Sequence, residues 1–260
     1  MRTGLLYAVA LLACALSVVP PLWALFVSLS VHHGGGIALG LANYRKILGE
    51  PQFWSSIWHS FATSALATTV SVFLGAMAAY GMTRFGRSFR RLAFGILAIR
   101  MIPSIVLVIP CYLLFRDIGL LDTVTGLAAI YLTFSVPFAI WMIRGFFAAI
   151  PLDIDEAARM DGASSWTVLW RVIVPIAAPP ILTTAILVFC FCWNEFLFAL
   201  VLTDQNALTF LPMLMRLVPP EGPLYGQIFA GSTIYFAVPI IAIALIRKQL
   251  EGSFTAGSVK

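Results

Sequence analysis

The chain has 260 residues, of which 61% are hydrophobic and 10% are charged, and its formal net charge at pH 7 is +5. Soluble domains carry roughly 25% charged residues, so this composition excludes an ordinary soluble protein. It predicts an all-α integral membrane protein that forms a single transmembrane domain over residues 1–260.

Six apolar runs are each long enough to cross a bilayer as a helix, which needs about 20 residues. They are apolar on all sides over that length, unlike the alternating segments of a membrane β-barrel. The first run is too long for the hydrophobic region of a signal peptide, so we expect an uncleaved anchor. The predicted spans cover residues 5–31, 57–82, 92–115, 124–143, 176–202 and 228–246.

The distribution of lysine and arginine predicts the orientation of these spans. With the N-terminus in the cytoplasm, most of these residues fall on the cytoplasmic side, as the positive-inside rule requires. Both termini are then cytoplasmic. The basic charge is explained by topology and anionic lipid rather than by nucleic acid, so we expect the lipid bilayer as a partner and no nucleic-acid partner.

Two charged side chains lie inside predicted spans, and such charges mark functional sites by default. Arg100 lies roughly 12 Å from the cytoplasmic end of the third span at 1.5 Å per residue. Glu195 lies past the middle of the fifth span, next to Asn194. We assign these three residues to a translocation pathway. The alternatives are that Arg100 reaches toward the inner headgroups and that Glu195 makes a structural hydrogen bond to a neighbouring helix.

A charged segment between the fourth and fifth spans, residues 151–175, carries the strongest motif. Asp153 and Glu156 have the spacing of a capping box at a helix start. Gly162 suits the left-handed residue that ends a helix, and Ser164 can cap a second helix. These features predict a helix, a sharp turn and another helix. An ordinary capped loop between two spans is the alternative interpretation.

The spacing within this segment resembles the EAA loop of ATP-binding-cassette import permeases. The family pattern is Glu-Ala-Ala, three residues, Gly, nine residues and Ile-x-Leu-Pro. The chain matches it at each position, with Val172 and Val174 in place of Ile and Leu. The resemblance implies a cytoplasmic helix that docks into an ATPase subunit. The residues implied in that coupling are Asp155, Glu156, Ala157, Ala158, Asp161, Gly162, Ala163 and Pro175.

The outer segment 204–227 is too apolar for a solvated loop, so we expect a short interfacial helix at the outer mouth.

Cys14, Cys111, Cys190 and Cys192 all fall inside spans, where they are expected to pack as small apolar residues. We therefore expect no disulfide, no metal site and no catalytic residue.

Other segments narrow the resemblance to carbohydrate-uptake permeases, namely residues 100–110, 119–123, 137–138 and 193–196. The C-terminal tail, residues 252–260, looks like the end of the maltose G-type permease subunit. By composition it should be disordered in water, whereas the resemblance implies that it lies between two ATPase subunits. The tail residues implied in that interface are Gly252, Thr255, Ala256, Gly257 and Lys260.

The resemblance implies the permease half of a sugar importer in a bacterial inner (plasma) membrane. Its partners would be a second permease subunit, forming a heterodimer, two ATPase subunits and an extracytoplasmic sugar-binding protein. No G-x-x-x-x-G-K-[ST] motif occurs, so ATP and Mg are expected on the ATPase partners and this chain is not expected to be an enzyme. Two other classes of protein remain as alternatives. An ion-coupled secondary transporter should show several intramembrane acids and internal repeats, and a membrane-embedded enzyme should show a cluster of His, Asp or Cys.

Overall fold

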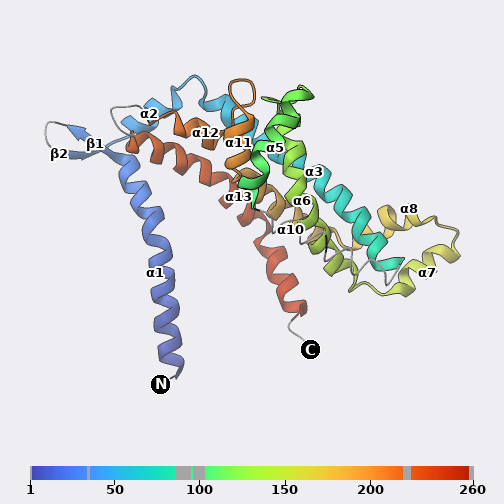
Figure 1. Cartoon of the computed structure of the whole chain (residues 1–260). Coiled ribbons are helices and arrows are strands. Elements are labelled where there is room, and N and C mark those ends of the chain that lie inside the picture. Colours follow the sequence, from blue (N-terminus) through green and yellow to red (C-terminus); the bar gives the residue numbers. More distant parts are fainter. Residues whose placement is uncertain (1, 34–35, 86–94, 96–102, 219–223, 258–260) are drawn as a thin grey trace.

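The computed structural model describes residues 2–33, 36–85, 95, 103–218 and 224–257. Helices dominate this part of the chain, and a two-stranded antiparallel sheet follows the first helix (Figure 1). The elements are α1 (Arg2–Leu29), β1 (Ser30–His33), β2 (Gly36–Leu39), α2 (Ala42–Leu48), α3 (Phe53–Arg84), α5 (Ser104–Asp117), α6 (Val124–Phe147), α7 (Leu152–Met160), α8 (Ser165–Val168), η1 (Leu169–Ile173), α9 (Val174–Ile176), α10 (Ala178–Trp193), α11 (Leu197–Leu202), α12 (Phe210–Met215) and α13 (Tyr225–Gly257).

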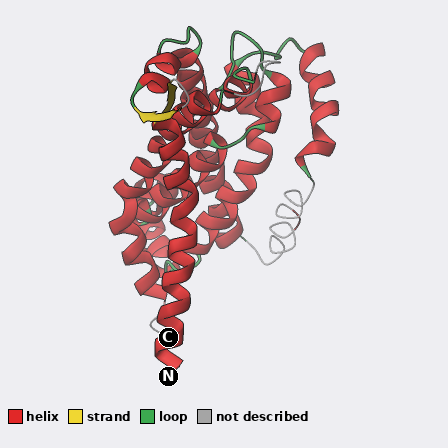
Figure 2. Ribbon diagram, turned by 90° about the vertical axis from the view of Figure 1, so that its left-hand side faces the viewer, coloured by secondary structure: helices red, strands yellow, loops and turns green. Residues whose placement is uncertain are grey.

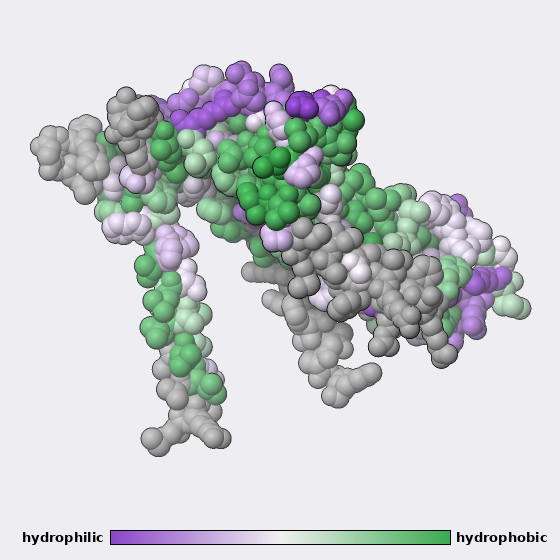
Figure 3. All heavy atoms as spheres, in the orientation of Figure 1, coloured by the Kyte–Doolittle hydropathy of each residue, from purple (hydrophilic) through white to green (hydrophobic). Residues whose placement is uncertain are grey.

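Four helices in the described part are long and apolar enough to cross a membrane: Val9–Leu29, Phe53–Arg84, Val124–Phe147 and Tyr225–Ala244. The pair Ser165–Ile176 and Ala178–Trp193 would add a fifth, but it is bent by 84°. The predicted third span, residues 92–115, lies partly outside the described residues, and α5 begins within its second half. Figure 3 shows hydrophobic residues over the middle of the molecule, between hydrophilic residues along the upper edge and near α7.

The expected continuous fifth span is wrong. A bend at Ala177 separates α9 from α10. Pro179 and Pro180 follow in the first turn of α10, and neither supplies a backbone N–H. The helix then stops at Trp193 and resumes only at Leu197 as the short α11. Residues 178–202 therefore form two helical pieces, α10 and α11, joined by a break.

Helices α3 and α6 pack along each other, and α10 lies against both. Small residues allow this approach: a Cβ built on Gly75 would lie 2.8 Å from the Cβ of Ala139. One turn away, the hydroxyls of Ser71 and Ser135 form a buried hydrogen bond of 2.7 Å. Close approach through small residues and hydroxyl pairs is typical of helices that associate inside a membrane.

Helix α1 stands apart from the bundle along most of its length (Figure 1), and none of its membrane-span window is buried. Both ends of the chain lie on one side of the molecule, opposite α2 and α12 (Figures 1 and 2). Helix α13 continues to Gly257, beyond the predicted span end at residue 246, whereas its candidate membrane span is Tyr225–Ala244. The backbone of the tail is therefore helical as far as Gly257. Lys260 lies outside the described residues.

The outer segment does contain a short helix, α12. Its apolar character has an internal cause, because Phe210, Met213 and Leu214 are buried in a cluster with residues of α2, α3 and α13. The helix therefore packs into the chain's own core through these residues, while Met215 is exposed.

Candidate functional site

Helix α7 begins at Leu152, with Pro151 as the preceding cap residue and no side-chain hydrogen bond at its start. The predicted capping box is therefore wrong. Because the helix starts earlier than the motif requires, Asp153 already lies inside the first turn and cannot act as the cap. Its charge still lies where the helix dipole favours an acid.

The turn after α7 forms as predicted. Gly162 has φ +82°, in the left-handed region. The N–H of Ala163 donates to the carbonyl of Ala158 (3.0 Å) and that of Gly162 to the carbonyl of Arg159 (3.0 Å), which is the paired arrangement of a Schellman motif. Ser164 Oγ accepts from the N–H of Thr167 (3.2 Å) and caps α8.

The side chains of α7 divide into an exposed and an inward face. Ile154, Asp155 and Ala158 turn toward the core cluster formed by the ends of α3 and α6 and by η1, whereas Met160 is 88% exposed. Most of the residues expected to contact an ATPase lie on the accessible side. Glu156, Ala157, Asp161, Gly162 and Pro175 are exposed, and Ala158 and Ala163 are half-buried.

Asp155 differs from the other members of this set, because it is 4% exposed and faces α3. Its Oδ2 lies 2.9 Å from the Arg84 guanidinium, and its Oδ1 accepts from the Tyr80 hydroxyl at 3.0 Å. Arg84 also donates to the carbonyl of Ile150 (3.3 Å). No local pattern around the motif points to Tyr80 or Arg84, since both lie on α3, far from the motif in sequence.

The segment after α8 leads the chain back toward the bundle. Residues of η1 form a π-helical turn, a feature often found at functional positions. The Trp170 ring stacks on Phe73 of α3, with 5.1 Å between ring centroids. Val168 and Ile173 are fully buried in the same cluster that receives the inward face of α7. The inward face of α7 and the η1 segment are therefore anchored to α3 and α6, whereas the turn between α7 and α8 is exposed.

Glu195 lies at the break in the fifth span and caps the helix that follows. Its carboxylate accepts from the N–H groups of Leu197 (3.2 Å), Phe198 (3.1 Å) and Ala199 (3.4 Å). The neighbours of Glu195 therefore include the start of α11 and the Tyr131 side chain of the neighbouring helix α6. Asn194 is exposed and donates to the Cys190 carbonyl (2.8 Å). Arg100 lies outside the described residues.

Hydroxyl groups surround this break. Thr63 and Ser64 of α3 and Thr209 before α12 are buried beside Glu195, and their hydroxyls make no hydrogen bond in the described structure. The Tyr235 hydroxyl donates to the Trp193 carbonyl and so ties α13 to the end of α10. In the part of the chain that the structure describes, no group of three His, Cys, Asp or Glu side chains could hold a metal ion.

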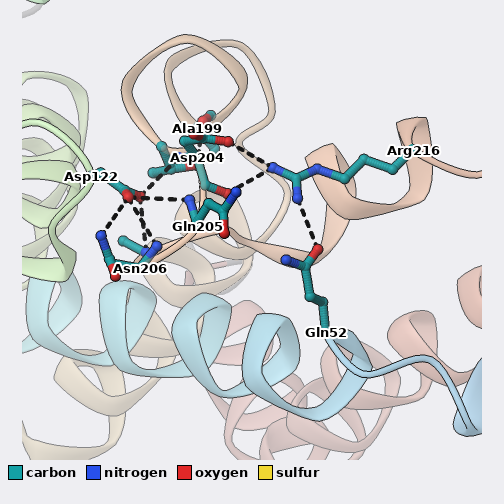
Figure 4. Close-up of polar contacts among 9 residues, drawn as sticks. Gln52, Asp122, Ala199, Asp204, Gln205, Asn206 and Arg216 are labelled. Atoms are coloured by element: carbon teal, nitrogen blue, oxygen red, sulfur yellow. Dashed lines mark hydrogen bonds and ion pairs between the residues drawn. The ribbon is translucent and has the colours of Figure 1, made fainter.

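At the opposite end of the molecule from α7, Asp122 joins two loops (Figure 4). Its carboxylate accepts from the N–H groups of residues 204–207 at 2.8–3.1 Å. Burial raises the pKa of this carboxyl, but the four backbone hydrogen bonds outweigh burial and the pKa lies below its ordinary value. Arg216 adds a pair with Asp204 (2.9 Å) and a hydrogen bond to Gln52 (2.8 Å).

Comparisons with known proteins agree with this geometry. The model of the family described as "Binding-protein-dependent transport system inner membrane component" matches residues 71–251. The chain is 41% identical over 223 residues to the trehalose transport system permease protein SugB of Mycobacterium tuberculosis, covering 84% of this chain and 81% of that protein. It is 32% identical over 227 residues to the trehalose/maltose transport system permease protein MalG of Thermococcus litoralis, covering 85% and 81%.

Among solved structures, the chain superposes on a chain from a bacterial ABC transporter involved in the import of the acidic polysaccharide alginate. The TM-score is 0.76, the sequence identity is 24%, and the match covers 94% of this chain and 95% of that one. At this identity the likeness shows a shared fold.

Proposed function

The chain belongs to the family of binding-protein-dependent transport system inner membrane components, and on that premise we propose that it is the permease half of an ATP-driven sugar importer. Together with a second permease subunit it forms the translocation pathway, and it couples to separate ATPase subunits through α7. Its permease relatives named for trehalose and maltose support a sugar as the substrate class.

The observation that carries this proposal is the two-faced helix α7 at one end of the bundle. Its exposed face presents Glu156 and Ala157, and its inward face is fixed to the ends of the membrane helices. A short helix that is anchored on one side and bare on the other can receive a movement from a partner and pass it into the bundle. Gly162 supports the same role by keeping the following turn compact.

The proposed topology has six spans, with residues 92–115 forming the third and the broken pair α10–α11 belonging to the fifth. Both termini and α7 lie in the cytoplasm of a bacterial cell, in line with the lysine and arginine distribution. The single domain then covers residues 1–260, with the coupling segment at 151–175 and the tail at 247–260. The position of both chain ends on one side of the molecule supports an even number of spans.

The translocation pathway is proposed to pass the break in the fifth span. The exposed amide of Asn194 can exchange hydrogen bonds with sugar hydroxyls, while Glu195 holds the break open by capping α11. Arg100 is retained as a third member from its place in the sequence. An unwound segment inside a membrane is tolerated where it lines a cavity.

The partners follow from the family. We assign one second permease subunit in a heterodimer, two ATPases that hold ATP and Mg, and an extracytoplasmic sugar-binding protein. The tail is proposed to reach between the ATPases through Gly252, Thr255, Ala256, Gly257 and Lys260. The helical continuation of α13 to Gly257 supports a tail that projects as a rod from the membrane.

Reconstitution tests this proposal through the energy source of transport. The chain, its permease partner and the ATPase subunits would be placed in proteoliposomes with a sugar-loaded binding protein, with trehalose and maltose as the first probes. Uptake should require ATP and should persist when ionophores collapse ion gradients. Uptake by this chain without ATPase subunits, driven by a proton or sodium gradient, would instead support a secondary transporter.

A further inference from the structure

The cytoplasmic end of α3 and the first turn of α7 meet at a buried ion pair. Arg84 is the last residue of α3 and Asp155 lies in the first turn of α7, and their side chains are 4% and 5% exposed. The Tyr80 hydroxyl, one turn back on α3, occupies the second carboxylate oxygen. The guanidinium also reaches the carbonyl of Ile150 in the turn that follows α6. Three segments are therefore joined at one ion pair.

Moving α7 away from α3 would cost free energy at this contact. A buried carboxylate that loses its partner remains charged in a place that water does not reach. The free-energy cost of such an unpaired buried charge is far larger than the cost of separating an exposed ion pair. Hydrogen bonds to charged groups are also shorter and stronger than neutral ones. Helix α7 thus cannot swing away from α3 without exposing or stranding one of these charges.

Helix α3 connects this ion pair to the membrane helices. Helix α3 packs along α6, and the two are joined by the Ser71–Ser135 hydrogen bond and by the close approach at Gly75. The acids on the other face of α7, Asp153 and Glu156, are exposed. The helix therefore separates two tasks, since its exposed face is free for a partner and its inward carboxylate holds the bundle.

We propose that Asp155 and Arg84 form a clamp that makes α7 and α3 move as one body, so that a displacement of α7 is delivered to the spans. Asp155 is then a positioning residue rather than an ATPase contact, which revises the role that the motif implied for it. Delivery of an ATPase movement rests on the proposed function, whereas the rigidity of the α3–α7 joint does not.

The rigidity is tested by spin-label distance measurements on the intact chain in nanodiscs. The four native cysteines are replaced, and labels are placed at Met77→Cys on α3 and Met160→Cys on α7, both at exposed positions. We expect a narrow distance distribution in the parent chain and in the control Asp153→Asn, which removes an exposed acid from the same helix. The distribution should broaden in Asp155→Asn and in Arg84→Gln. A distribution that stays narrow in both variants overturns the clamp.

Coupling is tested in the reconstituted complex by the number of sugar molecules taken up per ATP hydrolysed. This ratio should fall in Asp155→Asn, because ATP hydrolysis would then move α7 without moving α3. The double variant Asp155→Asn/Arg84→Gln leaves no unpaired charge and should regain thermal stability while the ratio stays low. Arg84→Lys keeps the positive charge and should retain much of the parent's ratio of sugar taken up to ATP hydrolysed.

The outcomes separate the clamp from the proposed function. A double variant that is well folded and transports with the parent ratio would overturn the clamp, because stability alone would then explain the single variants. If the parent chain binds no ATPase subunit at all, the proposed function fails, and the label distances still decide whether the pair holds α7 to α3.

Discussion

At the scale of single residues, Asp155 and Asp122 use their carboxylates in the same way at opposite ends of the molecule. Each accepts hydrogen bonds from a segment far away in the sequence, Asp155 from α3 and Asp122 from residues 204–207. Neither role could be inferred from a local pattern, because the partners are brought close only by the packing of the helices. Gly162, in contrast, was predictable from its neighbours alone.

Replacement of Gly162 by Leu should uncouple transport from ATP hydrolysis. The left-handed φ of +82° would cost a residue with a Cβ about 1–2 kcal/mol, although a Cβ there would meet nothing within 4 Å. Strain and added bulk at the exposed turn would therefore disturb the docking helix rather than the core. Gly162→Asn, which tolerates the left-handed region, is the control and should retain most uptake. Normal uptake and normal ATPase association in Gly162→Leu would count against the docking role.

Replacement of Asp122 by Ala should lower the free energy of unfolding by about 1–3 kcal/mol, because backbone N–H groups of the outer loop lose their acceptor. Asp117→Ala is the matched control, since Asp117 is exposed and pairs only with its neighbour Arg116 among the described contacts. Thermal unfolding in detergent measures both. An equal, small effect of the two variants would show that the loop does not depend on this carboxylate.

The lowered pKa of Asp122 predicts that its contribution to stability depends on pH. The folded-state pKa of Asp122 is below its ordinary value, so its contribution to stability is complete above the ordinary aspartate range and is lost as the pH falls through the lowered pKa. The stability difference between the parent chain and Asp122→Ala should therefore be full at pH 7 and shrink on strong acidification. A difference that grows as the pH falls would contradict this assignment.

At the scale of elements, the contact between α3 and α6 depends on the absence of a side chain at Gly75. A Cβ there would lie 2.8 Å from the Ala139 Cβ and 3.1 Å from backbone, so Gly75→Ala should force the helices apart and cost about 1–3 kcal/mol. Gly145→Ala on α6, where a Cβ meets nothing within 4 Å, is the control and should be neutral or slightly stabilising. Thermal unfolding in nanodiscs measures the two variants, and equal stability would refute the close approach.

The apolar runs predicted α1, α3, α6 and α13, because length and hydropathy alone decide whether a helix can cross a membrane. They could not predict the interruption of the fifth span, since Trp193 and Leu197 lie in a run with the same apolar character on both sides. The break depends on the Glu195 cap and on contacts from α3 and α13. The turn at Gly162 was predictable because its geometry is local, whereas the inward side of α7 depends on Arg84.

At the scale of the whole molecule, the tail extends the last membrane helix beyond the bundle. Deletion of Gly252–Lys260 should impair ATP-driven uptake while membrane insertion and thermal stability stay normal, because these residues lie past the predicted membrane span. Replacement of the tail by an equally long Gly/Ser sequence separates its length from its sequence and should be equally impaired. Transport at the full rate by the truncated chain would show that the tail has no part in coupling.

We expect the exposed face of α7 to dock on a separate ATPase subunit. Site-specific photocrosslinking tests it directly, with a photoreactive amino acid at Ala157 on α7 or at Thr125 near the start of α6 as an exposed control. In the active reconstituted transporter, we predict a crosslink from position 157 to the ATPase subunit and none from position 125. Active transport without any ATPase crosslink from position 157 would show that this face of α7 does not dock on the ATPase.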